Sequence, residues 1–168
     1  MTQSIDVPTS VDTFLQELAA IQQVGPKRVA ILGSRHVPIT HQYLIETLSY
    51  ALALTGNQIL TSGAIGTNLA VIRGAVRADM KSLTVILPQS LERQPAESRA
   101  SLEQVLHLVE HPENDHLPLA EASRLCNLEI IGKCQQLICF VFHDSITLLD
   151  ACKHAEEQHK LVTLFYFD

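Results

Sequence analysis

The chain has 168 residues, of which 46% are hydrophobic, and this fits one globular domain with its own core. It carries 12 Lys and Arg against 18 Asp and Glu, a formal net charge of −6. Non-specific DNA binding neutralises many phosphates with basic side chains, so the composition argues against a protein that grips DNA over a broad surface. Any phosphate site must be local, built from backbone N–H groups, helix ends and one or two arginines.

The sequence predicts neither a secretory signal nor a membrane span. The first ten residues lack a basic region followed by an apolar run, and no stretch of about 18 residues is uniformly apolar. The four cysteines (Cys126, Cys134, Cys139 and Cys152) lie in apolar or helical stretches and form no Cys-x-x-Cys pair. We therefore expect reduced core thiols, a cytoplasmic location, and neither a metal site nor a cofactor.

Helices and strands alternate along the chain. Apolar residues at helical spacing predict a helix from Val11 to Gln22, and we assign residues 1–26 to an N-terminal helical extension and residues 27–168 to the main domain. The main domain is predicted to begin with a strand at Val29–Leu32 ending at Gly33, a helix at Thr40–Thr55, a strand at Gln58–Thr61, a helix at Thr67–Met80 and a strand at Leu83–Leu87.

The second half of the domain continues the alternation after a polar segment. It is predicted to contain a loop at Gln89–Arg99, a helix at Leu102–Val109 that ends in a short strand at Leu108–Glu110, a helix from Pro118 to Lys133, a strand at Leu137–Phe142, a helix from Ser145 to His159 and a strand at Leu161–Phe165. Thr40, Thr67 and Ser145 are the expected helix caps. Tyr43 and Leu44 are expected on the inner face of their helix, with Leu48 and Ala51.

This order predicts an α/β, Rossmann-like three-layer fold with a mostly parallel sheet flanked by helices. In such folds ligands bind beyond the carboxyl ends of the strands. Four loops are therefore candidates for a site, namely Gly33–Pro38, Thr61–Thr67, Pro88–Arg93 and His143–Thr147.

Two of these loops have the chemistry of a phosphate site. In the first, Gly33 allows close backbone approach, Ser34 offers a hydroxyl and Arg35 offers a forked cation. The second, from Thr61 to Thr67, precedes a helix whose first N–H groups can bind an anion, and it contributes the candidates Ser62, Gly63, Gly66 and Thr67. It is neither a G-x-G-x-x-G turn nor a P-loop, because the lysine of the latter is absent. The alternative for both loops is a plain tight turn.

The loop His143-Asp144-Ser145-Ile146-Thr147 does not predict a catalytic triad, because a triad is assembled across a fold rather than from neighbours in sequence. We expect ligand contacts from Asp144, Ser145 and Thr147. On the helix that follows Pro118, Asn127 is expected on a solvated face, and His111, like the other scattered histidines, at the surface.

Together these motifs resemble the DNA-processing protein A (DprA, or Smf) family of the SLOG superfamily of Rossmann-like nucleotide binders. Gly33-Ser34-Arg35 matches its G-S-R motif, and Ser62-Gly63-Ala64-Ile65-Gly66 matches its S-G-x-x-x-G turn. The resemblance covers residues 27–167. It implies a non-catalytic protein that binds the phosphate of a nucleotide or of single-stranded nucleic acid, with a role in DNA recombination or in nucleotide sensing.

The sequence departs from the family at two elements. The arginines of the R-N-R-I-I helix are absent from Asn127-Leu128-Glu129-Ile130-Ile131, and Ile146 replaces a glycine of S-G-S. Two alternatives therefore stay open. One is a phosphoribohydrolase of the LOG group, which the fold resembles, acting on nucleoside monophosphates with Asp150 or Glu129 as its carboxylate. The other is a partner-binding module without a ligand, in which the N-terminal helix is the docking element.

The helices Thr40–Thr55 and Thr67–Met80 are more apolar than a single buried stripe requires. The apolar side chains concerned are Ile45, Leu48, Ala51, Leu52, Ala53 and Leu54 on the first helix, and Leu69, Ala70, Val71, Ile72, Ala75 and Val76 on the second. We predict that part of this surface is buried in a homodimer, since two-fold pairs are the commonest oligomers.

Overall fold

The computed structural model describes residues 10–22 and 27–168. Its centre is a six-stranded sheet of order β4-β3-β2-β1-β5-β6 in which every neighbouring pair is parallel. The strands are β1 (Arg28–Gly33), β2 (Gln58–Thr61), β3 (Leu83–Ile86), β4 (His107–Val109), β5 (Gln136–Val141) and β6 (Leu161–Tyr166). The predicted α/β, Rossmann-like class is confirmed.

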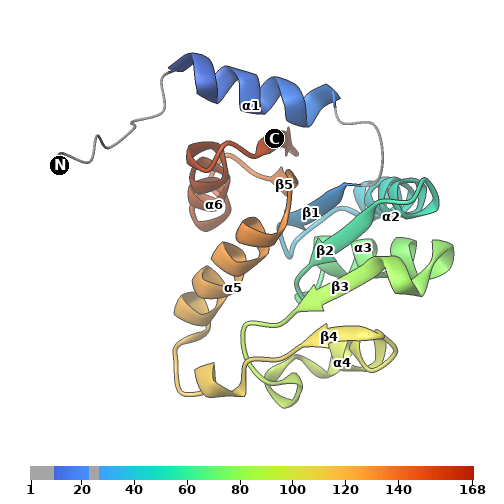
Figure 1. Ribbon diagram of the computed structural model, residues 1–168. Helices are drawn as coiled ribbons and strands as arrows, with labels where there is room; N and C mark the ends of the chain where they lie inside the picture. The colour runs from blue at the N-terminus through green and yellow to red at the C-terminus, as the bar shows by residue number, and fades with distance from the viewer. Residues whose placement is uncertain (1–9, 23–26) are drawn as a thin grey trace, which may run out of the picture.

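Helices cover both faces of the sheet and give the fold three layers. Figure 1 shows α5 and α6 on one side and α2, α3 and α4 on the other. The helices are α1 (Ser10–Gln22), α2 (Ile39–Leu54), α3 (Thr67–Ala78), α4 (Ala96–Leu102), α5 (Leu119–Lys133) and α6 (Ile146–Glu157), with short 3-10 helices at Met80–Ser82, Leu91–Arg93 and Pro112–Asn114.

Strand β1 shows why the sequence forms such a sheet. Its residues alternate between two cores: Val29 and Ile31 pack with α2 and α3, whereas Ala30 and Leu32 pack with α5 and α6. A strand buried on both faces must be apolar throughout, which is the continuous apolar run seen in the sequence. Four of its residues are at most 2% exposed, so β1 anchors the centre of the molecule.

Helices α2 and α3 pack unusually closely. Gly74 allows this, because a Cβ at that position would overlap the carbonyl oxygen of Glu46. The buried Ser49 hydroxyl donates a 2.7 Å hydrogen bond to the carbonyl of Val71 on the facing helix. The inner face of α2 is therefore built around Ile45, Ser49 and Ala53.

The expected inner face and cap of α2 were wrong in part. Tyr43, Leu44 and Ala51 are exposed, and the helix begins after Pro38 at Ile39, so Thr40 lies inside it rather than at the cap. The reason is that α2 is apolar nearly all round. No single stripe in the sequence indicates which side faces α3.

The apolar residues of α3 lie within the monomer. Leu69, Ala70, Val71, Ile72 and Ala75 are all buried in the core beneath α2 and over the sheet. These five side chains are therefore covered within the chain, whereas Val76, the sixth residue named on this helix, is half-buried. Of the residues of α2 expected in an interface, Leu54 is exposed, whereas Ile45 and Ala53 are buried.

The segment after β3 differs from the prediction. Residues 89–99, expected to be a loop, include a 3-10 turn and the start of α4, which follows Pro95. The expected helix from Leu102 to Val109 is absent, because α4 ends at Leu102 and the chain becomes strand β4. The short strand at Leu108–Val109 is present within β4, where it pairs with β3.

Helix α1 confirms the predicted helix at Val11–Gln22. It contacts β6 and lies at the top of Figure 1. Its apolar side chains, Val11, Phe14, Leu15, Leu18 and Ile21, are exposed. The predicted boundary between residues 26 and 27 falls next to a segment outside the described residues. No helix in the described part of the chain has the length and apolar character needed to cross a bilayer.

Candidate phosphate-binding site

A cavity of about 650 Å³ opens at the carboxyl ends of β1, β2 and β5. Three strand-end loops and the N-terminal half of α5 form its walls. It is lined by Leu32, Gly33, Ser34, Arg35, His36, Ser62, Ala64, Asn68, Leu119, Ala120, Ser123, Asn127, Asp144, Ser145, Ile146, Thr147 and Leu148. Its volume is in the range of small-molecule sites, and its position is the one expected of an open parallel sheet.

Backbone contacts fix the first loop between its neighbours. The Ser34 N–H donates to the carbonyl of Phe140 in β5 at 2.9 Å. The Ser34 carbonyl accepts from the N–H and the hydroxyl of Thr67 at 3.1 and 2.9 Å. The loop that carries Arg35 is thus attached to β5 on one side and to the start of α3 on the other, and these three parts of the site form one unit.

Polar side chains from the second loop and the first turn of α3 lie at the base of the cavity. Asn68 is 5% exposed, and its Oδ1 lies 3.2 Å from the hydroxyl of Thr61, which also donates to the Ile31 carbonyl at 2.7 Å. Ser62 is buried, with its hydroxyl 3.7 Å from the Cys126 thiol. A buried amide and hydroxyl held in this way give the cavity a polar base that does not have to reorganise when a ligand arrives.

The first turn of α6 forms another wall of the cavity and offers hydrogen-bond donors to an anion. Residues 144–148 all line the cavity, and first-turn amides of a helix have no acceptor within their own helix. The Ile146 amide is already taken, since it donates to the Asp144 carbonyl at 2.8 Å. The remaining first-turn N–H groups and the Thr147 hydroxyl are the donors that this wall can offer a phosphate.

The charge of the lining is close to balanced. Arg35 is its single arginine and is exposed to solvent, and Asp144 contributes a carboxylate on the opposite wall. One guanidinium with several hydroxyl and amide donors suits one phosphate group rather than a row of them. Among the described residues, no group of three His, Cys, Asp or Glu is placed to hold a metal ion.

Most of the residues predicted from the sequence come together here. Those that line the cavity are Gly33, Ser34, Arg35, Ser62, Asp144, Ser145 and Thr147. Gly63, Gly66 and Thr67 do not line it. Their roles are structural, and the atoms packed around each residue show why that residue is needed there.

A side chain at Gly63 would overlap Leu87 of the core. Gly66 has a φ of 79°, which favours glycine, and a Cβ there would overlap the Arg35 carbonyl. Thr67 begins α3, preceded by Gly66 as its cap, and its hydroxyl bonds to Ser34 instead of capping the helix. These three residues shape the loops that present Ser34 and Arg35.

Ser145 takes the cap position of α6 as predicted, but its hydroxyl does not cap the helix. It accepts a 3.1 Å hydrogen bond from the Phe142 N–H. This closes the β5–α6 turn on itself. Ser145 therefore positions Asp144 and Thr147 while its own side chain is already occupied.

The loop Pro88–Arg93 was wrongly expected to contribute, since none of its residues lines the cavity. It is bound instead to the segment after β4. The Ser90 N–H and hydroxyl both donate to the Asp115 carboxylate at 2.8 Å, and the Leu91 N–H bonds to Glu110. β2 and β1 lie between β3 and β5 in the sheet, so the loop after β3 stays clear of the site.

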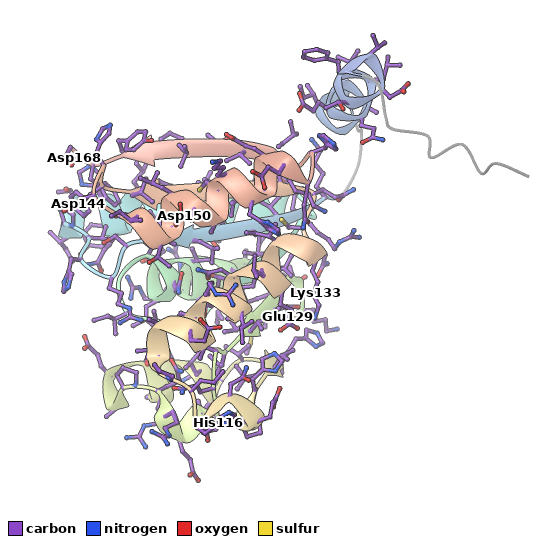
Figure 2. All side chains as sticks on the ribbon, turned by 90° about the vertical axis from the view of Figure 1, so that its left-hand side faces the viewer. His116, Glu129, Lys133, Asp144, Asp150 and Asp168 are labelled. Carbon is purple, nitrogen blue, oxygen red and sulfur yellow. The ribbon has the colours of Figure 1, made fainter. Side chains whose placement is uncertain are left out.

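The two carboxylates considered for catalysis, Glu129 and Asp150, lie in different surroundings. Glu129 accepts from Lys133 at 2.8 Å and lies 2.6 Å from His111 Nε2. Burial opposes its ionisation, but these hydrogen bonds outweigh it and lower the pKa of Glu129. Figure 2 shows Glu129 and Lys133 on α5, away from the end that carries Asp144. His111, expected at the surface, is half-buried as the link between this helix and the loop after β4.

Asp150 lies in a second groove, of about 390 Å³, between α5 and α6. The groove shares Ala120, Asn127 and Thr147 with the cavity, so the two are continuous. Asn127 was expected in solvent and instead lines both spaces. Ala120, Ser123 and Asn127 follow helical spacing, and this small and polar stripe on one face of α5 was the signal in the sequence.

Neither a protein-family model nor a curated protein sequence matches the chain. Solved structures do. One is DNA processing protein A from Helicobacter pylori, described for its single-stranded DNA binding mode, with a TM-score of 0.71, 20% identity and coverage of 83% of this chain and 65% of its own. Another is DNA processing protein A (DprA) from Streptococcus pneumoniae, with a TM-score of 0.66, 19% identity and coverage of 88% and 52%.

The chain therefore spans about two thirds and one half of the length of these two proteins. Their likeness agrees with the family resemblance drawn from Gly33-Ser34-Arg35 and Ser62-Gly63. Over most of its length, this chain has the Rossmann-like fold of DNA processing protein A.

Proposed function

We propose that the protein binds the phosphate group of a nucleotide or of single-stranded nucleic acid in the strand-end cavity, in a DprA-like role and without catalysis. One observation carries the proposal. Arg35, the hydroxyls of the loops and the first turn of α6 converge on one space at the carboxyl edge of a parallel sheet. Each is a phosphate-binding element in other proteins, and here they share a cavity.

The charge of the chain limits how it would bind a longer polymer. With a net charge of −6, attraction to a polyanion must come from this site rather than from the surface as a whole. Binding should therefore fall only modestly with added salt, because few counterions are released. A steep salt dependence would point to a separate basic surface.

Replacing Arg35 tests the proposal directly. Arg35→Ala should weaken binding of a short fluorescent oligothymidylate and of nucleoside monophosphates at least tenfold, on the order of 1.4 kcal/mol for one charge-assisted contact. Arg99→Ala is the matched control, because Arg99 is an exposed arginine on α4 outside the cavity. The proposal is lost if wild type binds no nucleotide or single strand, or if Arg35→Ala binds as wild type does.

A second candidate is hydrolysis of the N-glycosidic bond of a nucleoside monophosphate, as in the LOG group. The observation that favours it is the Asp150 carboxylate in the groove joined to the cavity at Asn127 and Thr147. Water would add to the sugar carbon as the bond to the base breaks, giving free base and ribose 5-phosphate, with Asp150 stabilising the cationic centre. Chromatography of a nucleotide panel should then show free base with wild type and none with Asp150→Asn. Absence of turnover with wild type would remove this candidate.

We further propose that the chain forms a homodimer and is cytoplasmic, with residues 27–168 as its main domain. Four free, buried thiols are consistent with a reducing compartment. The exposed apolar side chains of α1 and of the outer face of α2 are the surface that a second copy would cover in the dimer. Light scattering should give twice the chain mass of 18.6 kDa. A mass of 18.6 kDa at micromolar concentration would contradict the dimer and leave the exposed α1 face as a docking element for a different partner.

A further inference from the structure

Two exposed aromatic rings are stacked at the β5–α6 loop, which also forms one wall of the cavity. The His143 ring, in the β5–α6 loop, lies on the Tyr166 ring at the end of β6, with centroids 3.9 Å apart and planes 10° from parallel. The side chain of His143 is 64% exposed and Tyr166 is 43% exposed. Aromatic rings stack readily on other planar groups, and an exposed pair of this kind is suited to a planar ligand.

Asp168 and the end of β6 hold the stack in place. The Asp168 carboxylate accepts from the backbone N–H of His143 at 3.0 Å and lies 2.8 Å from its Nδ1. The hydrogen bond from His143 holds the pKa of Asp168 below its usual range, which keeps the carboxylate available as an acceptor. The Phe167 N–H donates to the Val141 carbonyl at 2.9 Å and fixes this end of β6 to β5. The rings are thus oriented before any ligand binds.

The stack and the cavity adjoin at one loop. His143 directly precedes Asp144, which lines the cavity, and in Figure 2 Asp144 and Asp168 lie at the same end of the sheet. Ile146 belongs to the lining of the cavity and is itself 69% exposed. Ile146 therefore gives the cavity an exposed apolar edge.

We propose that the His143–Tyr166 stack takes a base of a single-stranded nucleic acid whose neighbouring phosphate lies in the cavity. This inference rests on the proposed function. Aromatic side chains bind bases of any identity by their π faces, so the platform fits a ligand read without sequence preference. The Asp168 carboxylate, which bonds to His143, repels a phosphate but not a neutral base. The backbone of the strand therefore passes by Arg35, and a base one or two nucleotides along covers the rings.

Two ligands of equal charge distinguish the proposed stacking platform from the proposed phosphate site. An oligothymidylate and an abasic deoxyribose-phosphate strand of the same length have the same phosphates and differ only in the bases. Wild type should bind the oligothymidylate about tenfold more tightly, in the range of one stacked base. Tyr166→Ala should abolish that preference and leave the abasic strand unaffected. Tyr166→Phe, which keeps the ring, should restore it, and this guards against a loss of folding in the alanine variant.

Tyr43→Ala is the matched control, since Tyr43 is a 64% exposed tyrosine on α2 outside the cavity. If neither strand binds wild type, the proposed function itself fails. If both strands bind equally, or if Tyr166→Ala keeps the preference, the phosphate site stands and the stacking platform is overturned. Thymidine monophosphate should bind Tyr166→Ala as it binds wild type. An equal loss with the mononucleotide would overturn the assignment of the stacked base to a neighbouring nucleotide.

Discussion

Gly74 in α3 and Gly132 in α5 are both helical glycines, and alanine at the two positions should change the free energy of unfolding in opposite directions. In a helix interior, alanine is favoured over glycine by about 1 kcal/mol. No heavy atom lies within 4 Å of the position that a Cβ on Gly132 would take. Gly132→Ala should therefore stabilise the protein by roughly 0.5–1 kcal/mol.

The surroundings of Gly74 reverse the sign. A Cβ there would overlap the Glu46 carbonyl oxygen and lie 3.0 Å from the Ser49 Cβ, so α2 and α3 would have to separate. Overpacking of this kind costs about 1–3 kcal/mol. Separation also stretches the 2.7 Å bond from Ser49 to the Val71 carbonyl, which is worth about 1 kcal/mol. After the helical gain of about 1 kcal/mol, the net loss is roughly 2 kcal/mol, or about 4–8 °C in Tm.

Urea unfolding followed by circular dichroism measures both effects. Gly74→Ala should lower the midpoint without changing the slope, and Gly132→Ala should raise it. The second variant controls for the helical preference itself, because it has the same substitution without the crowding. A Gly74→Ala protein as stable as wild type would refute the close contact of α2 with α3 as the reason for this glycine.

Three further changes have defined outcomes. Hydrogen bonds to Glu113 and Glu129, opposed by burial, raise the pKa of His111 above its ordinary value of 6.5, so its stabilisation is complete below that pH and is lost as pH rises through the raised pKa. The urea midpoint of wild type should therefore fall as pH rises, and that of His111→Gln should not. An identical fall in both proteins would contradict this role of His111. Burial raises the pKa of Cys126 to about 12, so a thiol reagent should label it only after unfolding, and rapid labelling of the native protein would disprove this. Thr67→Val removes a 2.9 Å hydrogen bond to the β1 loop and should cost about 1 kcal/mol in urea unfolding. Thr67→Ser should cost less, and equal losses would mean that the methyl group matters instead.

The order of the elements could be predicted because buried parallel strands have a strong signature. Residues 29–32 and 137–141 are continuous apolar runs, and each is followed by a polar turn and an amphipathic or apolar helix. The position of the site followed from that order, since ligands bind at the carboxyl ends of such strands. Arg35 and Asp144 were expected at this edge of the sheet for that reason, and both line the cavity there.

The sequence could not predict which polar groups the loops would use on one another. The hydroxyl of Thr67 and that of Ser145 were expected to cap helices, but Thr67 donates to the Ser34 carbonyl in the β1 loop, and Ser145 accepts from the Phe142 N–H within its own turn. The pairing of Thr67 depends on how closely two loops approach, which no local pattern encodes. The same holds for Asn127, because whether a helical residue faces solvent or a cavity depends on where the neighbouring helix lies. Tyr43 was misplaced for this reason too.

The central strand has neighbours that are made at very different times. β1 pairs with β2, which follows after a single helix, and with β5, where Arg28 N–H bonds to the Gln135 side chain across 107 residues. During synthesis, one edge of β1 therefore stays unpaired until most of the chain has emerged from the ribosome, and such non-local pairing is slow. The Phe140 carbonyl that holds Ser34 arrives with that late strand. A nascent or partly folded chain thus lacks a finished cavity. A ligand of this site would bind only molecules whose sheet is complete, and its binding would shift the folding equilibrium towards them.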